Sequence, residues 1–214
     1  ENTVQSTETA SESEKTEQTE STHKLVFLTS TLGDMGFYDN AWEGVQKLAN
    51  DYGYTCEAIE MGADASIYEA SFLDALDSGK YDVFLTDVIG GMSDYVNKYA
   101  ADYPDYKFIV FDVGRDFQVA SDNIVALTYL QNEGAYLAGV LAAALSQTGK
   151  IGIYLHADNT VLNDFATGYY QGASDYNPDI KIFTAYGAGI SGDSARCSDL
   201  TGVMFDNGAD VVFG

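Results

Sequence analysis

Residues 24–49, KLVFLTSTLGDMGFYDNAWEGVQKLA, decide the fold class of this chain. Residues 25–28 are apolar without interruption, which is typical of a strand buried on both faces. Apolar residues at positions 41, 45, 48 and 49 recur at helical spacing, so we expect a helix over Asp39–Tyr52. The loop between the two holds glycines, aspartates and aromatic residues. Ligands of open parallel sheets bind beyond the carboxyl ends of the strands, so this loop is the first candidate binding site.

The remainder of the chain repeats this alternation of strand and helix. Apolar, β-rich runs are expected to form strands over residues 24–30, 54–60, 81–87, 106–112, 123–129, 150–156, 180–187 and 209–214. Helical patterns cover residues 39–52, 67–78, 93–103, 132–146, 161–176 and, more weakly, 194–207. Such alternation predicts an α/β protein with parallel sheets and helices on both faces.

One break in the alternation predicts two lobes. No helical pattern fits residues 113–122, so two strands follow one another directly. We expect the chain to cross between lobes near residues 124–131, with an N-terminal lobe over 24–124 and a second lobe over 125–214. The run at 209–213 would be a bare edge strand, which is an aggregation hazard. We therefore expect the natural protein to continue beyond this point.

Residues 1–23 differ in composition from the rest. Glu, Ser and Thr make up 16 of the first 22 positions, and Val4 is the one branched apolar residue there. Such a segment cannot bury enough surface to offset its ordering entropy, so we expect disorder. It is either an acidic tether that holds a domain away from a surface or a remnant of cloning or processing.

Charge and cysteine content exclude several classes of protein. The net charge of −23, from 33 acidic and 10 basic residues, would be repelled by nucleic acid and by anionic membranes. No apolar run approaches the roughly 18 residues of a membrane-spanning helix. Cys56 and Cys197 are too far apart in sequence to suggest a metal site or a disulfide framework.

Several expected strands end in polar residues that would converge on one rim of a sheet. These residues are Thr29-Ser30, Thr86-Asp87, Asp112, and His156 with Asp158. Carboxylates there would accept hydrogen bonds from a neutral polar ligand. The alternative is that an aspartate after a strand caps the next helix. That alternative is stronger for Asp87 than for Asp112, which no helix follows.

Phe37 and Tyr38 are expected in the loop, where core packing explains large aromatic side chains less easily. An aromatic ring exposed in a cleft is suited to stacking on a planar base or a sugar face. Local packing is the alternative for Phe37, and Trp42 is expected in the core. Asp34, Asp39 and Asn40 are the candidates to cap the helix that follows, and one of the two aspartates is expected to be structural.

Signals for catalysis are weak. The chain has two histidines, His23 and His156, and no Cys/His, Gly-x-Ser-x-Gly or phosphate-loop arrangement. We therefore expect no catalytic residue, no metal site and no cofactor, although His156 as a general base stays open. A phosphorylated ligand would need cations, and the only arginines are Arg115 and Arg196.

Four sequence blocks, in this order, resemble the basic membrane protein family of substrate-binding lipoproteins, which includes purine nucleoside receptor lipoproteins of ABC importers. The blocks are LGDMGFYDNAWEG (32–44), YPDYKFIVFD (103–112), EGAYLAGVLAA (133–143) with TGKIG (148–152), and NPDIK (177–181) with GADVVF (208–213). The resemblance covers residues 24–214. It implies a type I periplasmic-binding-protein fold, in which two α/β lobes joined by crossing hinge strands close on a ligand.

The resemblance also implies roles for single residues. Phe37 matches the aromatic residue that stacks on the ligand base, Asp34 the aspartate of the same loop, Asp112 the carboxylate that binds the base, and Phe213 a strand-end residue at the cleft. Two positions depart from the nucleoside-binding pattern. Tyr38 stands where Asn is usual and Ser30 where Asp is usual, and a phenol cannot reproduce the paired donor and acceptor of an amide.

The resemblance implies a solute-binding protein that is extracytoplasmic and lipid-anchored to the outer face of the bacterial membrane. We expect it to bind a nucleoside-like small molecule, to deliver it to an ABC permease and to be a monomer. The alternatives are a ligand-sensing ectodomain of the same fold, or a binder of a sugar or another small polar solute. A nucleoside-processing enzyme is the least favoured alternative.

Overall fold

Five apolar runs form the parallel sheet of the first lobe. The computed structural model describes residues 23–187 and 194–214, so the predicted tether over 1–22 lies outside the described residues. The strands are β1 (Lys24–Thr29), β2 (Thr55–Glu60), β3 (Val83–Thr86), β4 (Lys107–Phe111) and β5 (Ile124–Leu127), in the order β2-β1-β3-β4-β5. The interior strand β1 is buried from Leu25 to Thr29, because helices cover both faces of the sheet.

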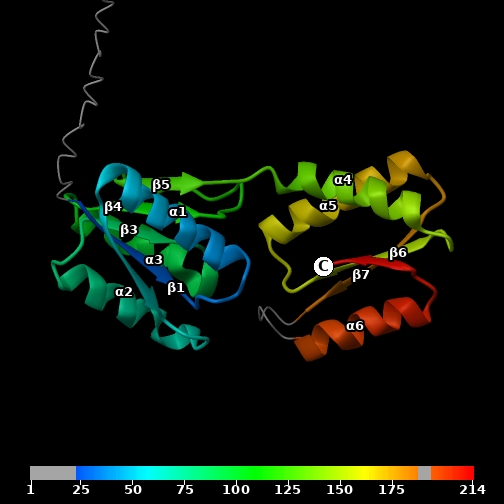
Figure 1. The fold of residues 1–214 in the computed structure, drawn as a ribbon, viewed down its shortest axis with the longest axis horizontal. Helices are drawn as coiled ribbons and strands as arrows, with labels where there is room; N and C mark the ends of the chain where they lie inside the picture. Colours follow the sequence, from blue (N-terminus) through cyan, green and yellow to red (C-terminus); the bar gives the residue numbers. More distant parts are fainter. Residues whose placement is uncertain (1–22, 188–193) are drawn as a thin grey trace, which may run out of the picture.

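The helices of the first lobe divide between the two faces of this sheet (Figure 1). They are α1 (Phe37–Tyr52), α2 (Tyr68–Asp77) and α3 (Met92–Tyr99), with 3₁₀ turns over Ala65–Ile67, Ile89–Gly91 and Ala100–Asp102. Residues of α1 pack on the side chains of Leu25 and Phe27, whereas α2 and α3 pack on those of Val26 and Leu28. The alternation of side chains along a strand produces this division.

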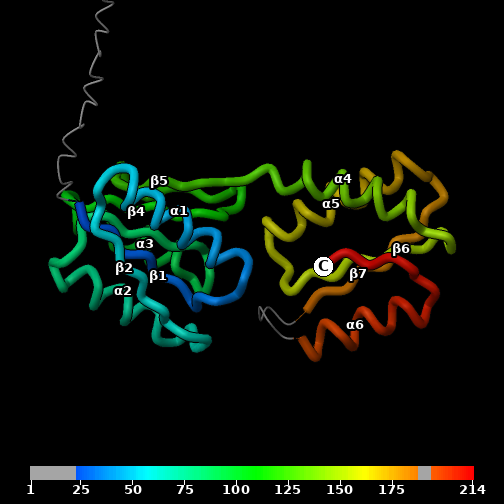
Figure 2. The backbone as a smooth tube through the Cα atoms, viewed as in Figure 1, coloured from blue at the N-terminus to red at the C-terminus, as the bar shows by residue number. Residues whose placement is uncertain are grey.

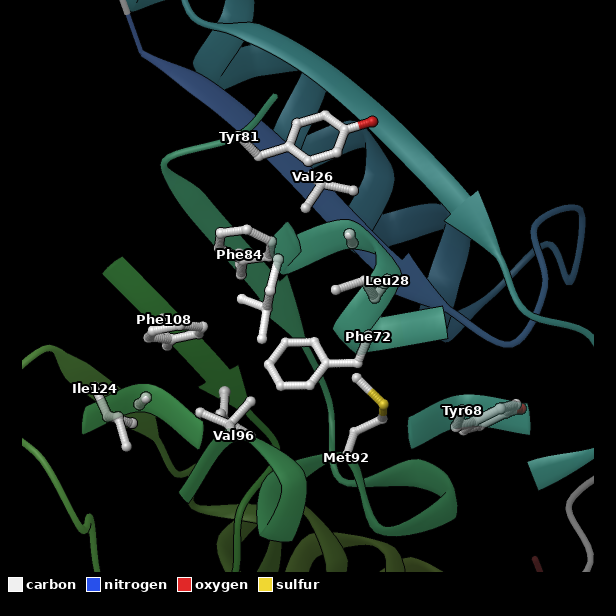
Figure 3. Packing of buried hydrophobic residues seen from close by; sticks show 14 of the residues in the cluster. Val26, Leu28, Tyr68, Phe72, Tyr81, Phe84, Met92, Val96, Phe108 and Ile124 are labelled. Atoms are coloured by element: carbon white, nitrogen blue, oxygen red, sulfur yellow. The ribbon is translucent and has the colours of Figure 1, made fainter. Parts of the chain in front are cut away.

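Aromatic rings fill the core on the α2–α3 side (Figure 3). The ring of Phe72 lies edge-on to that of Phe84, with centroids 6.3 Å apart, and to that of Phe108 at 6.1 Å. Met92 and Val96 of α3 complete this cluster. Burying a side chain of this size contributes about 1.5–3 kcal/mol, so this core supplies much of the stability of the first lobe.

The second lobe is a smaller sheet with helices on both faces (Figure 1). Its elements are α4 (Gln131–Leu145), β6 (Lys150–Leu155), α5 (Thr160–Tyr176), β7 (Lys181–Tyr186), α6 (Ser194–Asp206) and β8 (Val211–Phe213). The strands are parallel in the order β7-β6-β8. Helices α4 and α5 lie together on one face and α6 on the other. The predicted fold class, two parallel α/β lobes, is confirmed.

The described chain passes from one lobe to the other after β5 (Figure 2). This strand pairs with β4, so the first sheet extends to Leu127, and residues 128–130 lead into α4. The crossing expected near residues 124–131 contains this strand and the connection. The boundary placed at residue 124 lies within β5.

Helix α1 begins two residues before its predicted start. Phe37 and Tyr38 lie in its first turn, so the expectation that both belong to a loop is wrong. The physical cause is Asp34. Its carboxylate accepts hydrogen bonds from the backbone N–H groups of Gly36, Tyr38 and Asp39, which are the donors that a helix start leaves unsatisfied.

Residues 23–187 and 194–214, which the structure describes, hold neither a metal-binding cluster nor a membrane-spanning helix. No group of three or more His, Cys, Asp or Glu side chains in these ranges could hold a metal ion. No helix within these ranges has the length and apolar character needed to cross a bilayer. Cys56 and Cys197 are both half-buried free thiols.

Glycines allow α4 and α5 to pack with their backbones in contact. A Cβ atom on Gly139 of α4 would lie 2.1 Å from the carbonyl oxygen of Tyr169, and one on Gly172 of α5 would lie 2.0 Å from that of Tyr136. Real Cβ atoms never come this close to a backbone oxygen. The two helices would therefore have to separate to accept any larger residue.

We predict that Gly139→Ala destabilises the second lobe by several kcal/mol, because the clash is with backbone that cannot rotate away. The matched control is Gly134→Ala in the same helix, where an added Cβ meets nothing within 4 Å. That control is expected to raise stability by about 0.5–1 kcal/mol through helix propensity. Urea unfolding followed by circular dichroism measures both, and equal stability of the two variants would contradict the close packing.

A candidate ligand cleft between the lobes

The carboxyl ends of strands from both lobes border one cleft. Its volume is about 720 Å³, within the range of small-molecule sites. The first lobe contributes the loops after β1, β3 and β4, and the second lobe contributes the loop after β6 and the start of α5. The lining residues are Asp34, Phe37, Tyr38, Asp87, Val88, Ile89, Gly90, Ser93, Asp112, Gly114, Asp116, Phe117, His156, Ala157, Asn159, Thr160, Val161 and Leu162.

Phe37 presents a partly free aromatic ring to this cleft. The residue is 42% exposed although it lies in the first turn of α1. Its ring is 5.4 Å from that of Phe111 and meets the ring of Tyr38 edge-on at 5.2 Å. These two contacts fix the orientation of the ring, and its remaining surface is available for stacking.

Asp34 lines the cleft, but its carboxylate is committed to the start of α1. Both oxygens accept backbone hydrogen bonds, at 3.0 Å from Gly36 and Tyr38 and 3.1 Å from Asp39. Burial tends to raise the pKa of Asp34, and these hydrogen bonds outweigh it, so that its pKa lies below the ordinary value. Asp39 has a comparable role, since its carboxylate accepts from the N–H groups of Gly33 and Met35. Both aspartates are therefore structural.

Asp112 offers the freest carboxylate in the cleft. It follows β4 with a φ of 58°, in the left-handed region that aspartate occupies more readily than most side chains. Burial raises the pKa of this half-buried group. Within the described ranges, no residue donates a hydrogen bond to its carboxylate. An unpaired acceptor on strained backbone is typical of a functional site.

Tyr38 and Ser30 are less accessible from the cleft than Phe37 is. Tyr38 lines it but is only 9% exposed, because its ring packs in the core between the sheet and α1. Its hydroxyl interacts with the carboxylate of Asp87 and with the side chain of Ser30. Burial, and secondarily the charge of Asp87, raises the pKa of Tyr38. Ser30 is half-buried behind Tyr38 and does not border the cleft.

Phe213 is not brought to the cleft in this structure. Its ring stacks on that of Tyr169 at 5.4 Å, and both pack in the core of the second lobe. The hydroxyl of Tyr169 is buried without a hydrogen-bond partner within the described chain. The ligand contact expected for Phe213 stays a prediction, whereas Phe37, Asp34, Tyr38 and Asp112 come together at one wall.

The start of α5 forms the opposite wall. Asn159 caps this helix, with its side-chain oxygen accepting from the N–H of Leu162 at 2.9 Å. The hydroxyl of Thr160 donates to the carboxylate of Asp116 at 3.2 Å, which joins the two walls. A Cβ on Gly114 would lie 3.0 Å from that of Thr160, so the lobes approach closely here.

Four aspartates line the cleft: Asp34, Asp87, Asp112 and Asp116. No Lys or Arg among the described residues does so. A phosphate group in this cleft would face negative charge without a compensating cation, which costs several kcal/mol in a partly desolvated site. The cleft therefore suits a neutral ligand that carries hydrogen-bond donors.

A polar contact beside the cleft ties the lobes together, and we call it the Arg115 cluster. The Nε atom of Arg115, in the loop after β4, lies 3.2 Å from Oδ2 of Asp164 on α5, and its Nη2 donates to Oδ1 of Asn132 at 2.6 Å. The side chain of Gln131 donates to the same Asp164 oxygen at 3.0 Å. Gln131 and Asn132 are the first two residues of α4, and Asp164 lies near the start of α5.

An apolar cavity of about 950 Å³ adjoins the cleft on the α1 face of the first sheet. It shares Phe37, Asp112, Val161 and Leu162 with the cleft, and β4, β5 and α1 form most of its remaining wall.

The sequence of residues 22–214 matches the family described as PnrA-like ABC transporter substrate-binding proteins. The chain belongs to this family. The match covers both lobes, and it confirms the resemblance that the four sequence blocks indicate.

Curated relatives of this family member include a nucleoside-binding protein of an ABC transporter from Lactococcus lactis. It is 32% identical over 201 residues, which cover 89% of this chain and 54% of the relative. Basic membrane protein A1 of Borrelia garinii is 27% identical over an alignment that covers 87% of this chain and 54% of the relative. A CD4+ T-cell-stimulating antigen of Listeria monocytogenes is 29% identical, with 88% and 52% covered. The chain thus spans about half the length of these relatives.

Solved structures share the fold. An ABC transporter solute-binding protein from Aeropyrum pernix superposes with a TM-score of 0.74 at 23% identity, over 89% of this chain and 54% of that one. The fructose-binding periplasmic domain of a hybrid two-component system gives a TM-score of 0.68 at 17% identity, over 89% and 62%. These likenesses establish the type I periplasmic-binding-protein fold and nothing about the ligand.

Sequence reasoning missed several residues of the cleft. Ser93, Asp116, Asn159 and Thr160 line it, but no local pattern marks them. The capping role that the sequence offers for Asp87 has a counterpart in the structure, because its carboxylate accepts from the N–H of Ile89. Its position beside Tyr38 depends on the strand order, which brings the ends of β1 and β3 together.

We predict that Asp34→Ala lowers the free energy of unfolding by about 1 kcal/mol, because α1 loses its cap. Since the folded pKa of Asp34 is lowered, this contribution is present above the ordinary pKa of aspartate and is lost as the pH falls through the folded value. Denaturant unfolding at pH 7 and pH 3 tests this. Glu43→Ala, an exposed change on the same helix, is the control. A pH-independent loss in Asp34→Ala would contradict the capping role.

We also predict that Arg115→Ala loosens the arrangement of the lobes without unfolding either of them. An exposed pair of this kind contributes about 0.2–1 kcal/mol, enough to bias a hinge but not to hold a core. Small-angle scattering is expected to give a larger radius of gyration for the variant and for the parent at high salt. Lys98→Ala, which breaks an ion pair with Glu69 inside the first lobe, should leave the radius unchanged.

Proposed function

We propose that the protein is the extracytoplasmic solute-binding component of an ABC importer and that it binds a nucleoside-like ligand between its lobes. One observation carries the proposal: the exposed ring of Phe37 and the unpaired carboxylate of Asp112 border the same cleft. Membership of the substrate-binding family and the likeness to a relative named nucleoside-binding support it.

The two groups would recognise complementary parts of a planar base. The ring of Phe37 offers a π-face on which a base or a sugar face stacks. The carboxylate of Asp112 is an acceptor only, so it would bind N–H or O–H groups of the ligand. The absence of Lys and Arg from the described lining favours an unphosphorylated ligand over a nucleotide.

Binding would be coupled to hinge closure. The walls belong to different lobes, joined in the described chain through residues 128–130, so a ligand that contacts both stabilises the closed arrangement. A ligand shifts such an equilibrium by its difference in affinity for the two states. An ABC permease would then recognise the closed form. We further propose that the protein acts as a monomer, lipid-anchored to the outer face of the membrane.

A sensing ectodomain or a sugar-binding protein would use the same cleft. Pyranose rings also stack on aromatic side chains and donate hydroxyl groups to carboxylates. Titration of the parent with sugars as well as nucleosides separates the sugar-binding alternative from the nucleoside-binding one.

We predict that Phe37→Ala weakens nucleoside binding about ten-fold or more, because stacking on an aromatic side chain is worth roughly 1–3 kcal/mol per base. Isothermal titration calorimetry of the intact protein with inosine, guanosine and adenosine measures the change. The matched control is Tyr52→Ala, an exposed aromatic residue at the far end of α1. Parent-like affinity in Phe37→Ala would exclude the stacking role, and binding of sugars but not nucleosides by the parent would favour the alternative ligand.

A further inference from the structure

We propose that Asp87 is a specificity-determining residue of the cleft, which accepts a hydrogen bond from the ligand beside that accepted by Asp112, and that Tyr38 positions it. The proposal rests on the proposed function and deepens it. It assigns to the cleft a preference for a base with two adjacent donor groups. Among common purine nucleosides, guanosine has that property.

The position of Asp87 combines burial with access to the ligand. It follows β3 and is only 4% exposed, yet it borders the cleft. One oxygen accepts from the N–H of Ile89 at 3.1 Å, and the Tyr38 hydroxyl interacts with the carboxylate. A carboxylate has about four acceptor positions, so these two partners leave Asp87 able to accept from a further donor.

The identity of the residue argues against a purely structural role. The N–H of Ile89 would be satisfied equally well by the side-chain oxygen of an asparagine. An aspartate adds a negative charge that burial opposes. Burial is the main reason that the pKa of Asp87 rises to about 6, and the charge of Asp112 adds to it, whereas Ile89 and Tyr38 act in the opposite direction. A group kept at such a cost is a candidate for function.

No cation among the described lining residues compensates this charge. The polar and titratable groups around Asp87 come from every element that borders it. They are Ser30 after β1, Asp34 and Tyr38 at α1, Tyr68 of α2, Ser93 of α3, Asp112 and Asp116 after β4, and His156 of the second lobe. The hydroxyl of Tyr38 interacts with the Asp87 carboxylate, whereas that of Tyr68 donates to the carbonyl oxygen of Gly62 at 2.6 Å.

Tyr38 acts on the ligand through Asp87. Its ring is fixed in the core and touches the edge of Phe37, so its hydroxyl has a defined position against the carboxylate. The same side chain thereby links the stacking ring to the buried acceptor. Tyr38 also lines the cleft, so the direct ligand contact expected for it from the sequence stays a prediction beside this positioning role.

Two neighbouring carboxylates in a cleft select a base by the number and position of the hydrogen-bond donors that the base presents. Guanine presents its N1–H and its 2-amino group side by side. Hypoxanthine presents only the N1–H, and adenine has an acceptor at N1 next to its amino group. A buried carboxylate that receives no hydrogen bond from the ligand has lost its hydration without a replacement, which weakens binding. The effect is expected to be largest for adenosine, because the N1 of adenine is an acceptor where guanine has a donor.

The test uses the intact protein with guanosine, inosine and adenosine as probes in titration calorimetry at pH 7.5 and pH 5.5. The parent is expected to bind guanosine tightest at pH 7.5. Asp87→Asn should weaken guanosine binding roughly 10- to 100-fold, as expected for a hydrogen bond to a charged group, and should reduce the preference over adenosine. Asp94→Asn, an exposed change on α3, is the matched control and should alter neither quantity.

The pH profile and the thermal stability separate a ligand contact from a structural role. Because the folded pKa of Asp87 is raised, the carboxylate is ionised above about pH 6 and is lost as an acceptor below it. Parent affinity for guanosine should therefore fall between pH 7.5 and 5.5, and Asp87→Asn should make that fall smaller, with any remaining fall due to Asp112, whose pKa burial also raises. Tyr38→Phe should move the fall to higher pH, since Tyr38 lowers the pKa of Asp87.

The ligand-free melting temperature at pH 7.5 should rise in Asp87→Asn, because an uncompensated buried charge is removed. Parent-like guanosine affinity and pH profile in Asp87→Asn would overturn the inference and leave the proposed function intact. A lower melting temperature with equal loss of all three nucleosides would make Asp87 structural and also overturn it. A parent that binds none of the three would overturn both.

Discussion

The parallel pairing of β1, β3 and β4 is the constraint on which the site depends. Parallel strands place all their carboxyl ends at one rim, so the polar residues that follow them must share the same small volume. Ser30, Asp87 and Asp112 meet there although the sequence separates them widely. The helix after β1 then fills the rim with the aromatic pair Phe37 and Tyr38. An antiparallel arrangement of the same runs would have dispersed these groups to opposite edges.

The alternation of strands and helices could be predicted because buried strands and amphipathic helices leave distinct apolar patterns. The position of Phe37, Asp34 and Asp112 at the cleft could also be predicted, since a strand end followed by polar residues has a local signature, whereas their contact with a ligand stays a prediction. The start of α1 was misplaced because Asp34 caps the helix from outside it, across a Gly36 that has no side-chain cap of its own. The burial of Tyr38 followed from that shift and could not be read from composition.

Contacts between the lobes were beyond sequence reasoning for a different reason. The partners of Arg115 lie on α4 and α5, and nothing in the local pattern of either segment refers to the other. Their meeting depends on how the connection at residues 128–130 directs the second lobe. The contact of Asp116 with Thr160 has the same origin. Features that depend on three-dimensional placement therefore account for most of the missed residues.

The glycine contacts between α4 and α5 have a mechanical consequence. Where two backbones touch, no side chain remains that could change rotamer and absorb a displacement. The two helices therefore translate and rotate together, with β6 beneath them. Asn159 and Thr160 at the cleft belong to the same stiff unit as the outer surface of α4. If the proposed ligand displaces the start of α5, that distant surface would turn with it, and an event in the cleft would become a change of orientation on the outside of the molecule.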